Sequence, residues 1–353
     1  MRIVGSATYG YSSTRVKAME SKLLDSATIN QLSKMDDVAS MVGLLLQTSY
    51  KEYIEEFGGK DVRGDLIDFA LSKSLENDVK KLIAIVPKEQ KEMTARIVGR
   101  ADAQNIKLIF YAKTAGKSFD DISRYIVESY NLDTETMKRA IEEQTLDAAV
   151  ERLAVRSPYG NIIREALATY KKSGNLTEVN AVIDVGFFKE LEGAIRKLTE
   201  VSRESASVVR MDIEMRNILA LLRAKRHNLD IDRLTALLLD RGLTSIPMLR
   251  SMFESSKDVH DLVEKVKTFD LKKALELYDR KKGKQMLIFE LSMRSAIFRR
   301  AAAVLQHSTL SYAVIMGYFY LKEMEVFTLR ILINGKTYGL TREEIAEMVD
   351  WPL

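Results

Sequence analysis

Residues 101–118 have the sequence ADAQNIKLIFYAKTAGKS, and a related stretch returns at 213–230 as IEMRNILALLRAKRHNLD and at 324–341 as MEVFTLRILINGKTYGLT. Aligned without a gap, all three stretches have an acidic residue in second place, a lysine in thirteenth place and Gly or Asn in sixteenth place. The copies lie 112 and 111 residues apart. A repeat of this length has the size of a small domain and not of a solenoid unit, so we expect three related domains.

Apolar residues in each copy follow the spacing of a helix. In the first copy, Ala103, Ile106, Ile109 and Phe110 lie at positions i, i+3, i+6 and i+7, which form one stripe of an amphipathic helix. The aligned lysine, Lys113 in this copy, is expected in the last helical turn, where a cation opposes the negative end of the helix dipole. Each copy is therefore predicted to contain a helix that ends just after its lysine.

The residues after each lysine predict a tight turn between two helices. Gly and Asn accept the left-handed conformation that ends a helix, and Ser, Asp and Thr are preferred at the start of the next one. The predicted cap residues are Gly116, Asn228 and Gly339 at helix C-termini and Ser118, Asp230 and Thr341 at the following N-termini. Thr341 with Glu344 forms a full capping box in sequence, and Ser118 with Asp121 a near one.

A weaker repeat lies upstream of each copy. Thr48-Ser49-Tyr50, Ser157-Pro158-Tyr159 and Lys267-Thr268-Phe269 each close one helical stretch and precede another. We therefore expect an all-α protein of three similar helical-bundle domains in a pseudo-threefold arrangement, with boundaries near 128 and 242. The predicted domains are 1–128, 129–242 and 243–353, and residues 1–24 are an added segment without a counterpart in the other two.

Composition agrees with helices and excludes several kinds of site. The chain of 353 residues has four prolines and no cysteine, so long helices are permitted, whereas a disulfide framework, a cysteine-based zinc site and a thiol nucleophile are excluded. No signal-peptide pattern opens the chain, which predicts a cytosolic protein. The net charge of +4 is too small to indicate nucleic-acid binding.

One stretch imitates a phosphate-binding loop. Ala115-Gly116-Lys117-Ser118 matches the end of the motif G-x-x-x-x-G-K-[ST], but the first glycine of the motif would fall at Tyr111. No strand is predicted before it, and the other two copies have no such loop. A capping turn between helices accounts for all three copies, so we predict no nucleotide site.

Another stretch, 340–346, resembles the start of a DNA-reading helix-turn-helix. The predicted second helix carries Glu343, Glu344, Glu347 and Asp350, whose carboxylates would face phosphates unfavourably. A capped helix packed inside its own domain is favoured over nucleic-acid binding.

Residues 301–321 carry no formal charge, and their length would permit a membrane span. The polar residues Gln306, His307, Ser308 and Thr309 interrupt this stretch, which favours a buried pair of helices joined by a polar turn. We therefore predict no transmembrane span.

No residue pattern indicates catalysis, a cofactor or a metal. His227, His260 and His307 lie in different contexts and lack the spacing of metal ligands. The basic run 280–284 is expected to be a solvated loop. We predict no catalytic, cofactor-binding or metal-binding residues.

Two motifs at the ends of the chain carry a family resemblance. The first is Tyr9-x-Tyr11-x-x-x-Arg15-Val16-x-Ala18-Met19-x-Ser21-x-Leu23-Leu24. The second is Glu323-x-Glu325-Val326-x-x-Leu329-Arg330-Ile331-Leu332-Ile333-Asn334-Gly335-Lys336, where Thr328 replaces the usual Asn. Together with the length and the threefold repeat, they resemble the C subunits of archaeal-type and bacterial V-type ATP synthases, whose eukaryotic relative is the d subunit of the vacuolar ATPase.

The resemblance implies an all-helical funnel of three domains that acts as a non-catalytic part of the rotor. Such a protein would lie on the cytoplasmic face of the cell membrane as a peripheral protein. Its partners would be the D and F subunits of the central stalk and the membrane proteolipid ring, and it would couple the two for ATP-linked proton or sodium transport. No individual contact positions follow from the resemblance.

Two other functions also fit the sequence. A helical-repeat scaffold for soluble partners would share the repeat, and co-purification with ATPase subunits would distinguish it. A helix-turn-helix regulator that binds nucleic acid is less favoured, and would require a salt-dependent gel shift.

Overall fold

The computed structural model describes residues 7–58, 64–235, 238–280 and 285–348, and every regular element in these ranges is helical. The all-α prediction is therefore confirmed. The chain divides into two compact units, residues 52–197 and residues 1–51 with 198–353. The three-domain division at 128 and 242, the pseudo-threefold arrangement and the funnel shape remain predictions. The basic residues 281–284 and Asp350 lie outside the described ranges.

The unit of residues 52–197 is built of helices, and residues 103–187 form an apolar core within it. Its helices are α5 (Gly64–Ile85), η1 (Lys88–Gln90), α6 (Lys91–Val98), α7 (Arg100–Thr114), α8 (Phe119–Ile122), η2 (Ser123–Tyr125), α9 (Thr134–Glu142), α10 (Leu146–Arg156), α11 (Gly160–Ser173) and most of α12 (Leu176–Val201). Helix α10 packs between α9 and α11, and α7 contacts both α9 and α10. Phe110, Leu153, Ile163 and Ile183 are fully buried in the core, so the predicted apolar stripe of α7 faces inward.

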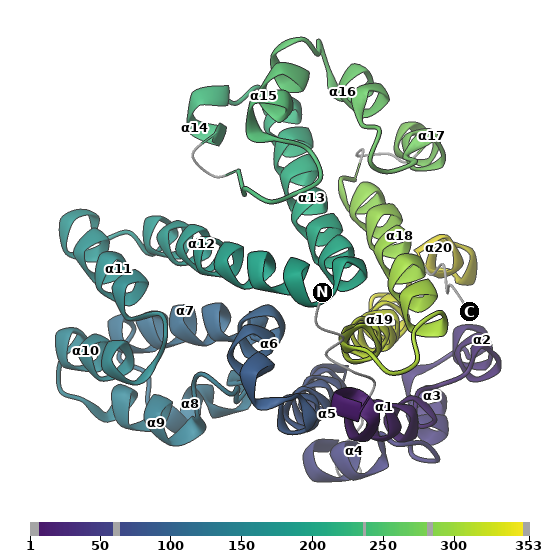
Figure 1. Ribbon diagram of the computed structural model, residues 1–353, viewed down its shortest axis with the longest axis horizontal. Coiled ribbons are helices and arrows are strands. Elements are labelled where there is room, and N and C mark those ends of the chain that lie inside the picture. The colour runs from purple at the N-terminus through teal and green to yellow at the C-terminus, as the bar shows by residue number, and fades with distance from the viewer. Residues whose placement is uncertain (1–6, 59–63, 236–237, 281–284, 349–353) are drawn as a thin grey trace. The chain divides into compact units, whose positions relative to one another are not determined.

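The other unit joins the beginning of the chain to its end. Its N-terminal helices are α1 (Ala7–Glu20), α2 (Ser26–Lys34) and α3 (Val38–Leu45). Helix α4 (Lys51–Gly58) follows and, apart from Lys51, belongs to the unit of residues 52–197. Its later helices are α13 (Arg203–Arg226), α14 (Ile231–Thr235), α15 (Ile246–Glu254), α16 (Val259–Lys265), α17 (Lys272–Arg280), α18 (Leu287–Gln306), α19 (Tyr312–Thr337) and α20 (Arg342–Met348). Helices α1 and α3 pack against α19, and α2 packs against α20 (Figure 1).

The uncharged stretch 301–321 forms two helices joined by a turn. Helix α18 ends at Gln306 and α19 begins at Tyr312, with Ser311 in the N-cap position. Every residue of α19 from Tyr312 to Leu321 is buried. A helix that is apolar on all sides lies in a core or a membrane, and here α18, α13 and α1 surround it. Among the residues that the structure describes, no helix is long and apolar enough to span a membrane.

The three repeated turns have the same backbone geometry. Gly116, Asn228 and Gly339 have φ of 63°, 51° and 72°, respectively. The amide of the next residue donates to a carbonyl five residues before it in each turn, with N–O distances of 2.8, 2.9 and 2.8 Å. This is the bond of a Schellman motif, which satisfies a carbonyl that the helix end leaves free.

The residues after each turn begin the next helix in related ways. Ser118 is the N-cap of α8 and makes a reciprocal capping box with Asp121. Thr341 and Glu344 exchange the same two bonds, of 3.0 and 3.1 Å. The Asp230 carboxylate accepts a bond of 3.0 Å from the amide of Asp232. Each turn thus satisfies the backbone groups of both helices that it joins.

Candidate functional site

The acidic residue of each repeat is fully buried. Asp102, Glu214 and Glu325, on α7, α13 and α19, have no exposed surface. Burying a carboxylate costs free energy unless hydrogen bonds compensate the charge. The partners of these three carboxylates therefore identify the contacts that each repeat requires, and we call the three clusters the Asp102, Glu214 and Glu325 junctions.

The Asp102 junction uses only neutral donors. The Tyr159 hydroxyl donates to Oδ2 over 2.7 Å, Asn131 Nδ2 donates to the same oxygen over 2.8 Å, and the Ser129 hydroxyl donates to Oδ1. Burial nevertheless raises the pKa of Asp102, because the hydrogen bonds only partly offset the loss of water. Burial and the neighbouring Asp102 carboxylate also raise the pKa of Tyr159, so the phenol remains a donor.

The Glu214 junction uses backbone and threonine donors. The amides of Leu243 and Thr244 donate to Oε2 over 2.9 and 3.0 Å. The hydroxyls of Thr244 and Thr268 donate to Oε1 over 2.5 and 3.2 Å. Thr268 takes this role because the residue in the tyrosine position of this copy is Phe269, which has no hydroxyl group.

The Glu325 junction adds a buried cation. The Tyr50 hydroxyl donates to Oε1 over 2.6 Å, and the Leu24 amide donates to Oε2 over 2.5 Å. Lys322 Nζ donates to Glu325 Oε1 over 2.8 Å and to the Tyr50 hydroxyl over 2.9 Å. The Lys322 side chain is 4% exposed, so this is a buried ion pair and not a surface one.

The donors show how the copies are joined. The Asp102 junction takes Tyr159 from the second upstream motif, and the Glu214 junction takes Thr268 from the third. The Glu325 junction takes Tyr50 from the first. Each copy therefore bonds to the start of the next one, and the last copy returns to the first. The sequence shows the aligned acids, but their partners lie too far along the chain to be identified from spacing.

The repeated asparagine holds the segment that follows each turn. Asn105 exchanges two bonds with the backbone of Val127, of 2.6 and 3.1 Å. Asn217 exchanges two with Leu239, each of 2.8 Å. In both copies the partner lies 22 residues later. In the third copy Thr328 takes this place, and the corresponding residue 350 lies outside the described ranges.

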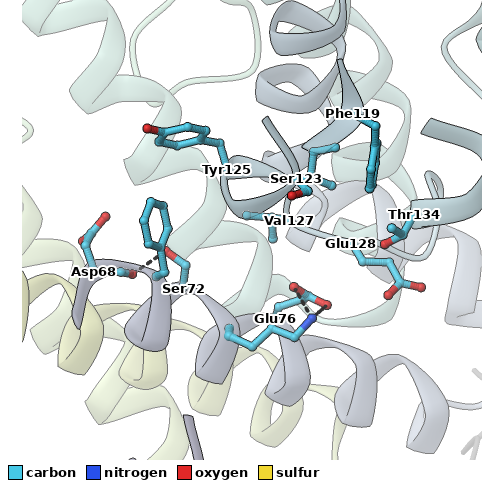
Figure 2. Close-up of a pocket in the computed structure, with 12 residues that line it drawn as sticks. Asp68, Ser72, Glu76, Phe119, Ser123, Tyr125, Val127, Glu128 and Thr134 are labelled. Carbon is cyan, nitrogen blue, oxygen red and sulfur yellow. Dashed lines mark hydrogen bonds and ion pairs between the residues drawn. The ribbon is translucent and has the colours of Figure 1, made fainter. Parts of the chain in front are cut away.

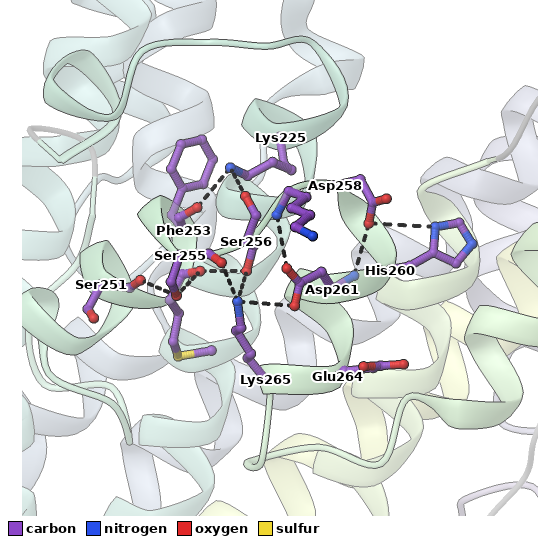
Figure 3. A network of polar contacts seen from close by, with 12 residues as sticks. Lys225, Ser251, Phe253, Ser255, Ser256, Asp258, His260, Asp261, Glu264 and Lys265 are labelled. Carbon is purple, nitrogen blue, oxygen red and sulfur yellow. Dashed lines mark hydrogen bonds and ion pairs between the residues drawn. The ribbon is translucent and has the colours of Figure 1, made fainter.

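The repeated lysines reach beyond their own helices. Lys113 and Lys225 lie in the last turns of α7 and α13. Lys225 Nζ donates to the carbonyls of Phe253 and Ser256 over 2.8 Å each, at the C-terminal end of α15 (Figure 3). Lys113 Nζ donates to carbonyls at the corresponding end of α9. The positions agree with the predicted last turns, but the ammonium groups cap a neighbouring helix.

A second lysine joins this end of α15. Lys265 Nζ donates to the Ser255 carbonyl over 2.6 Å and pairs with Asp261 at 3.1 Å (Figure 3). Burial, together with the nearby Lys265 ammonium, lowers the pKa of Lys225. Two cations at the C-terminal end of α15 stabilise the negative end of its helix dipole. This network therefore fixes α15 and α16 onto α13.

A pocket of about 320 Å³ lies in the unit of residues 52–197, between α5 and the segment after α7 (Figure 2). Buried Glu76 at its wall pairs with Lys73 and Lys80 at 3.1 and 2.8 Å. Lys80 also pairs with Glu128 at 2.7 Å. Because these carboxylates are held in ion pairs, the arrangement is that of a structural charge cluster.

The stretch that imitates a phosphate loop is occupied by internal bonds. The Lys117 amide donates to the Ala112 carbonyl, and the Ser118 hydroxyl accepts from the Asp121 amide. These donors and acceptors serve the helix ends, as the capping interpretation predicts. In the similar turn before α20, Arg342 pairs with Asp36 at 2.5 Å, which uses the first cation of the supposed recognition helix.

The histidines lie apart from one another. His227 and His307 are C-caps of α13 and α18. His260 Nε2 lies 2.7 Å from an Asp279 oxygen. Within the described ranges, no three side chains of His, Asp or Glu are grouped as metal ligands.

Comparison with known proteins identifies the family. The model of the ATP synthase (C/AC39) subunit family matches residues 12–348. The C subunit of the A-type ATP synthase of Methanocaldococcus jannaschii is 24% identical over 98% of this chain and 87% of its own length. The Methanosarcina barkeri counterpart is 26% identical over 98% and 93% of the two lengths. That of Haloquadratum walsbyi is 24% identical over 96% of both. The chain belongs to the ATP synthase (C/AC39) subunit family, and is thus a component of a rotary ATPase.

Proposed function

We propose that this chain is a non-catalytic rotor component that couples the central stalk of a rotary ATPase to its membrane proteolipid ring. The observation that carries the proposal is the family match, which extends over residues 12–348. Relatives matched over nearly their whole length are named as C subunits of A-type ATP synthases. The proposed partners are the D and F subunits of the central stalk and the proteolipid subunits of the ring.

The internal construction supports a mechanical role. A part that transmits torque has to resist shear between its helices, and buried hydrogen-bonded charges oppose such sliding because any displacement leaves a charge unsatisfied. Each of the three junctions satisfies one carboxylate with at least three donors. We expect this design to give stiffness, with the chemistry of ATP performed by other subunits.

The proposed location is the cytoplasmic face of the cell membrane, where the chain would bind as a peripheral protein. The charged residues, 29% of the chain, would provide much of the contact at the rim of the interface. Contacts of this kind weaken as salt screens the charges. We therefore expect the association to be lost at high ionic strength before the chain unfolds.

Purification of an affinity-tagged copy from native membranes tests the proposal. At low salt, we expect the head, the central stalk and the proteolipid ring to be recovered with it, and a high-salt wash to release the chain. A tagged copy that returns only soluble partners unrelated to an ATPase would refute the proposal and favour a scaffold.

A further inference from the structure

The three junctions differ in the length of the loop that each one closes. The donors of the Asp102 junction lie 27 to 57 residues from the carboxylate, and those of the Glu214 junction 29 to 54 residues away. At the Glu325 junction, Tyr50 and Leu24 lie 275 and 301 residues away. The entropy lost on closing a loop rises with the logarithm of its length, so the Glu325 junction is the costliest of the three to form.

The Glu325 junction also has a charge that the other two lack. Lys322 precedes Glu325 by three residues, and the matching positions are Met211 in the second copy and Gly99 in the first. A hydrogen bond between charged groups is stronger than a neutral one. The added cation therefore strengthens the junction at which chain entropy opposes closure most.

The segment held by this junction is residues 7–51, which we call the strap. It contains α1, α2 and α3, and residues 52–197 separate it in sequence from the rest of its unit. Its most extensive helix contacts are those of α1 and α3 with α19 and of α2 with α20. Val16 and Leu32 in the strap are fully buried, and Asp36 pairs with Arg342 at 2.5 Å.

We propose that the strap opens and closes as one unit at the Glu325 junction while the Asp102 and Glu214 junctions remain closed. Its opening breaks one buried cluster and the contacts with α19 and α20. The segments that donate to Asp102 and Glu214 are tethered by short loops, so they open only together with the cores around them. Locally cooperative openings of this kind are a general property of native proteins. The strap is thus a closing device of the fold.

Hydrogen exchange of the full-length protein, followed by mass spectrometry, tests this proposal. Tyr50→Phe removes one donor to Glu325, and Lys322→Met installs the residue of the second copy. Each variant should raise exchange in α1 to α3 by about tenfold or more, the factor for losing one hydrogen bond to a buried charge. Exchange of the slowest amides in α13 and α18 should rise by a similar factor, because unfolding of the whole unit also breaks the Glu325 junction. Thr268→Val, which removes a donor to Glu214, should instead raise exchange of these slow amides and leave exchange of the strap at the wild-type rate, because the Glu214 junction remains closed when the strap opens. As a matched control, Tyr159→Phe should raise the exchange rates of the slow amides in residues 64–173 together and leave the exchange rates of the strap unchanged.

A cross-link provides the reverse test. The chain has no cysteine, so Asp36→Cys with Arg342→Cys can be joined selectively by a short bis-maleimide. In the Tyr50→Phe background, the cross-link should return exchange in α1 to α3 to the wild-type rate. Strap exchange that rises in Thr268→Val together with that of α13 and α18, or a cross-link that restores nothing, would overturn the proposal.

The wild-type chain gives a test that does not depend on any variant. Strap opening exposes less surface than unfolding of the unit, so its exchange should depend less steeply on urea than that of α13 and α18. An equal urea dependence for the strap and for these two helices would show that the strap opens only by unfolding of the whole unit, against the proposal.

Discussion

Tyr159→Phe measures how much a junction contributes to stability. Tyr159 is 1% exposed, and its hydroxyl donates to Asp102 over 2.7 Å, whereas Phe retains the ring and nearly all of the packing. A hydrogen bond to a charged group contributes about 1.5–3 kcal/mol. Because the donors Ser129 and Asn131 remain on the carboxylate, we expect the free energy of unfolding of residues 52–197 to fall by about 2 kcal/mol.

The assay is native-state hydrogen exchange of the slowest amides in α9 to α11, where a loss of about 2 kcal/mol is roughly a thirtyfold rise in rate. Tyr170→Phe is the matched control. The ring of Tyr170 packs against the same core, and its hydroxyl makes no hydrogen bond to another described residue. The substitution should therefore change the free energy of unfolding by no more than about 0.5 kcal/mol.

A double-mutant cycle with Asp102→Asn separates the bond from general disturbance. Because the two groups touch, their effects should be non-additive by about 1–2 kcal/mol. A Tyr159→Phe loss below about 0.5 kcal/mol, or additive effects of the two substitutions, would show that the junction does not carry the stability assigned to it.

Three further outcomes are expected. Gly116→Val and Gly339→Val should each lower the free energy of unfolding by about 1–2 kcal/mol in thermal or urea unfolding, since φ is positive at both. Gly43→Ala, a site equally free of close neighbours but within helix α3, should raise it by about 0.5–1 kcal/mol. A change of the same sign at all three glycines would contradict the strain argument. Burial raises the pKa of Asp102, so the folded state retains its proton to higher pH than the unfolded chain. Stability should therefore fall as pH rises from about 4 through the folded pKa; Asp102→Asn should abolish this fall in pH-dependent urea titrations, and an unchanged pH profile would be the opposing result. The purified chain should not bind ATP in calorimetry, and Lys117→Ala should leave the ATPase activity of a reconstituted complex nearly unchanged; saturable binding lost in that variant would restore the nucleotide interpretation.

Much of the architecture follows from local sequence. The repeated apolar stripe predicts α7 and the C-terminal halves of α13 and α19, and the polar residues near His307 predict the turn that separates α18 from α19. The positive φ of Gly116 follows from its spacing to Ser118. These features depend on residues a few positions apart, where helix periodicity and capping rules apply.

The junctions could not be predicted in the same way. Aligned acids at Asp102, Glu214 and Glu325 signal a shared role, but their distant partners come from the following copy, and for Glu325 that copy is the first one. Only Lys322, three residues before Glu325, is a local partner. Lys225 illustrates the same limit. Its place in the last turn of α13 is local, whereas its bonds to the end of α15 depend on how the two helices pack. Tertiary contacts thus decide which donors satisfy a buried group.

Vesicles made from native membranes depleted of this chain test whether it couples the central stalk to the ring. The measurement is ATP-driven proton or sodium uptake alongside ATP hydrolysis by the same vesicles. We expect that hydrolysis by the head and stalk persists, ion pumping disappears, and addition of the purified chain restores pumping. Pumping that continues in membranes shown to lack the chain would contradict the assignment as a rotor coupler.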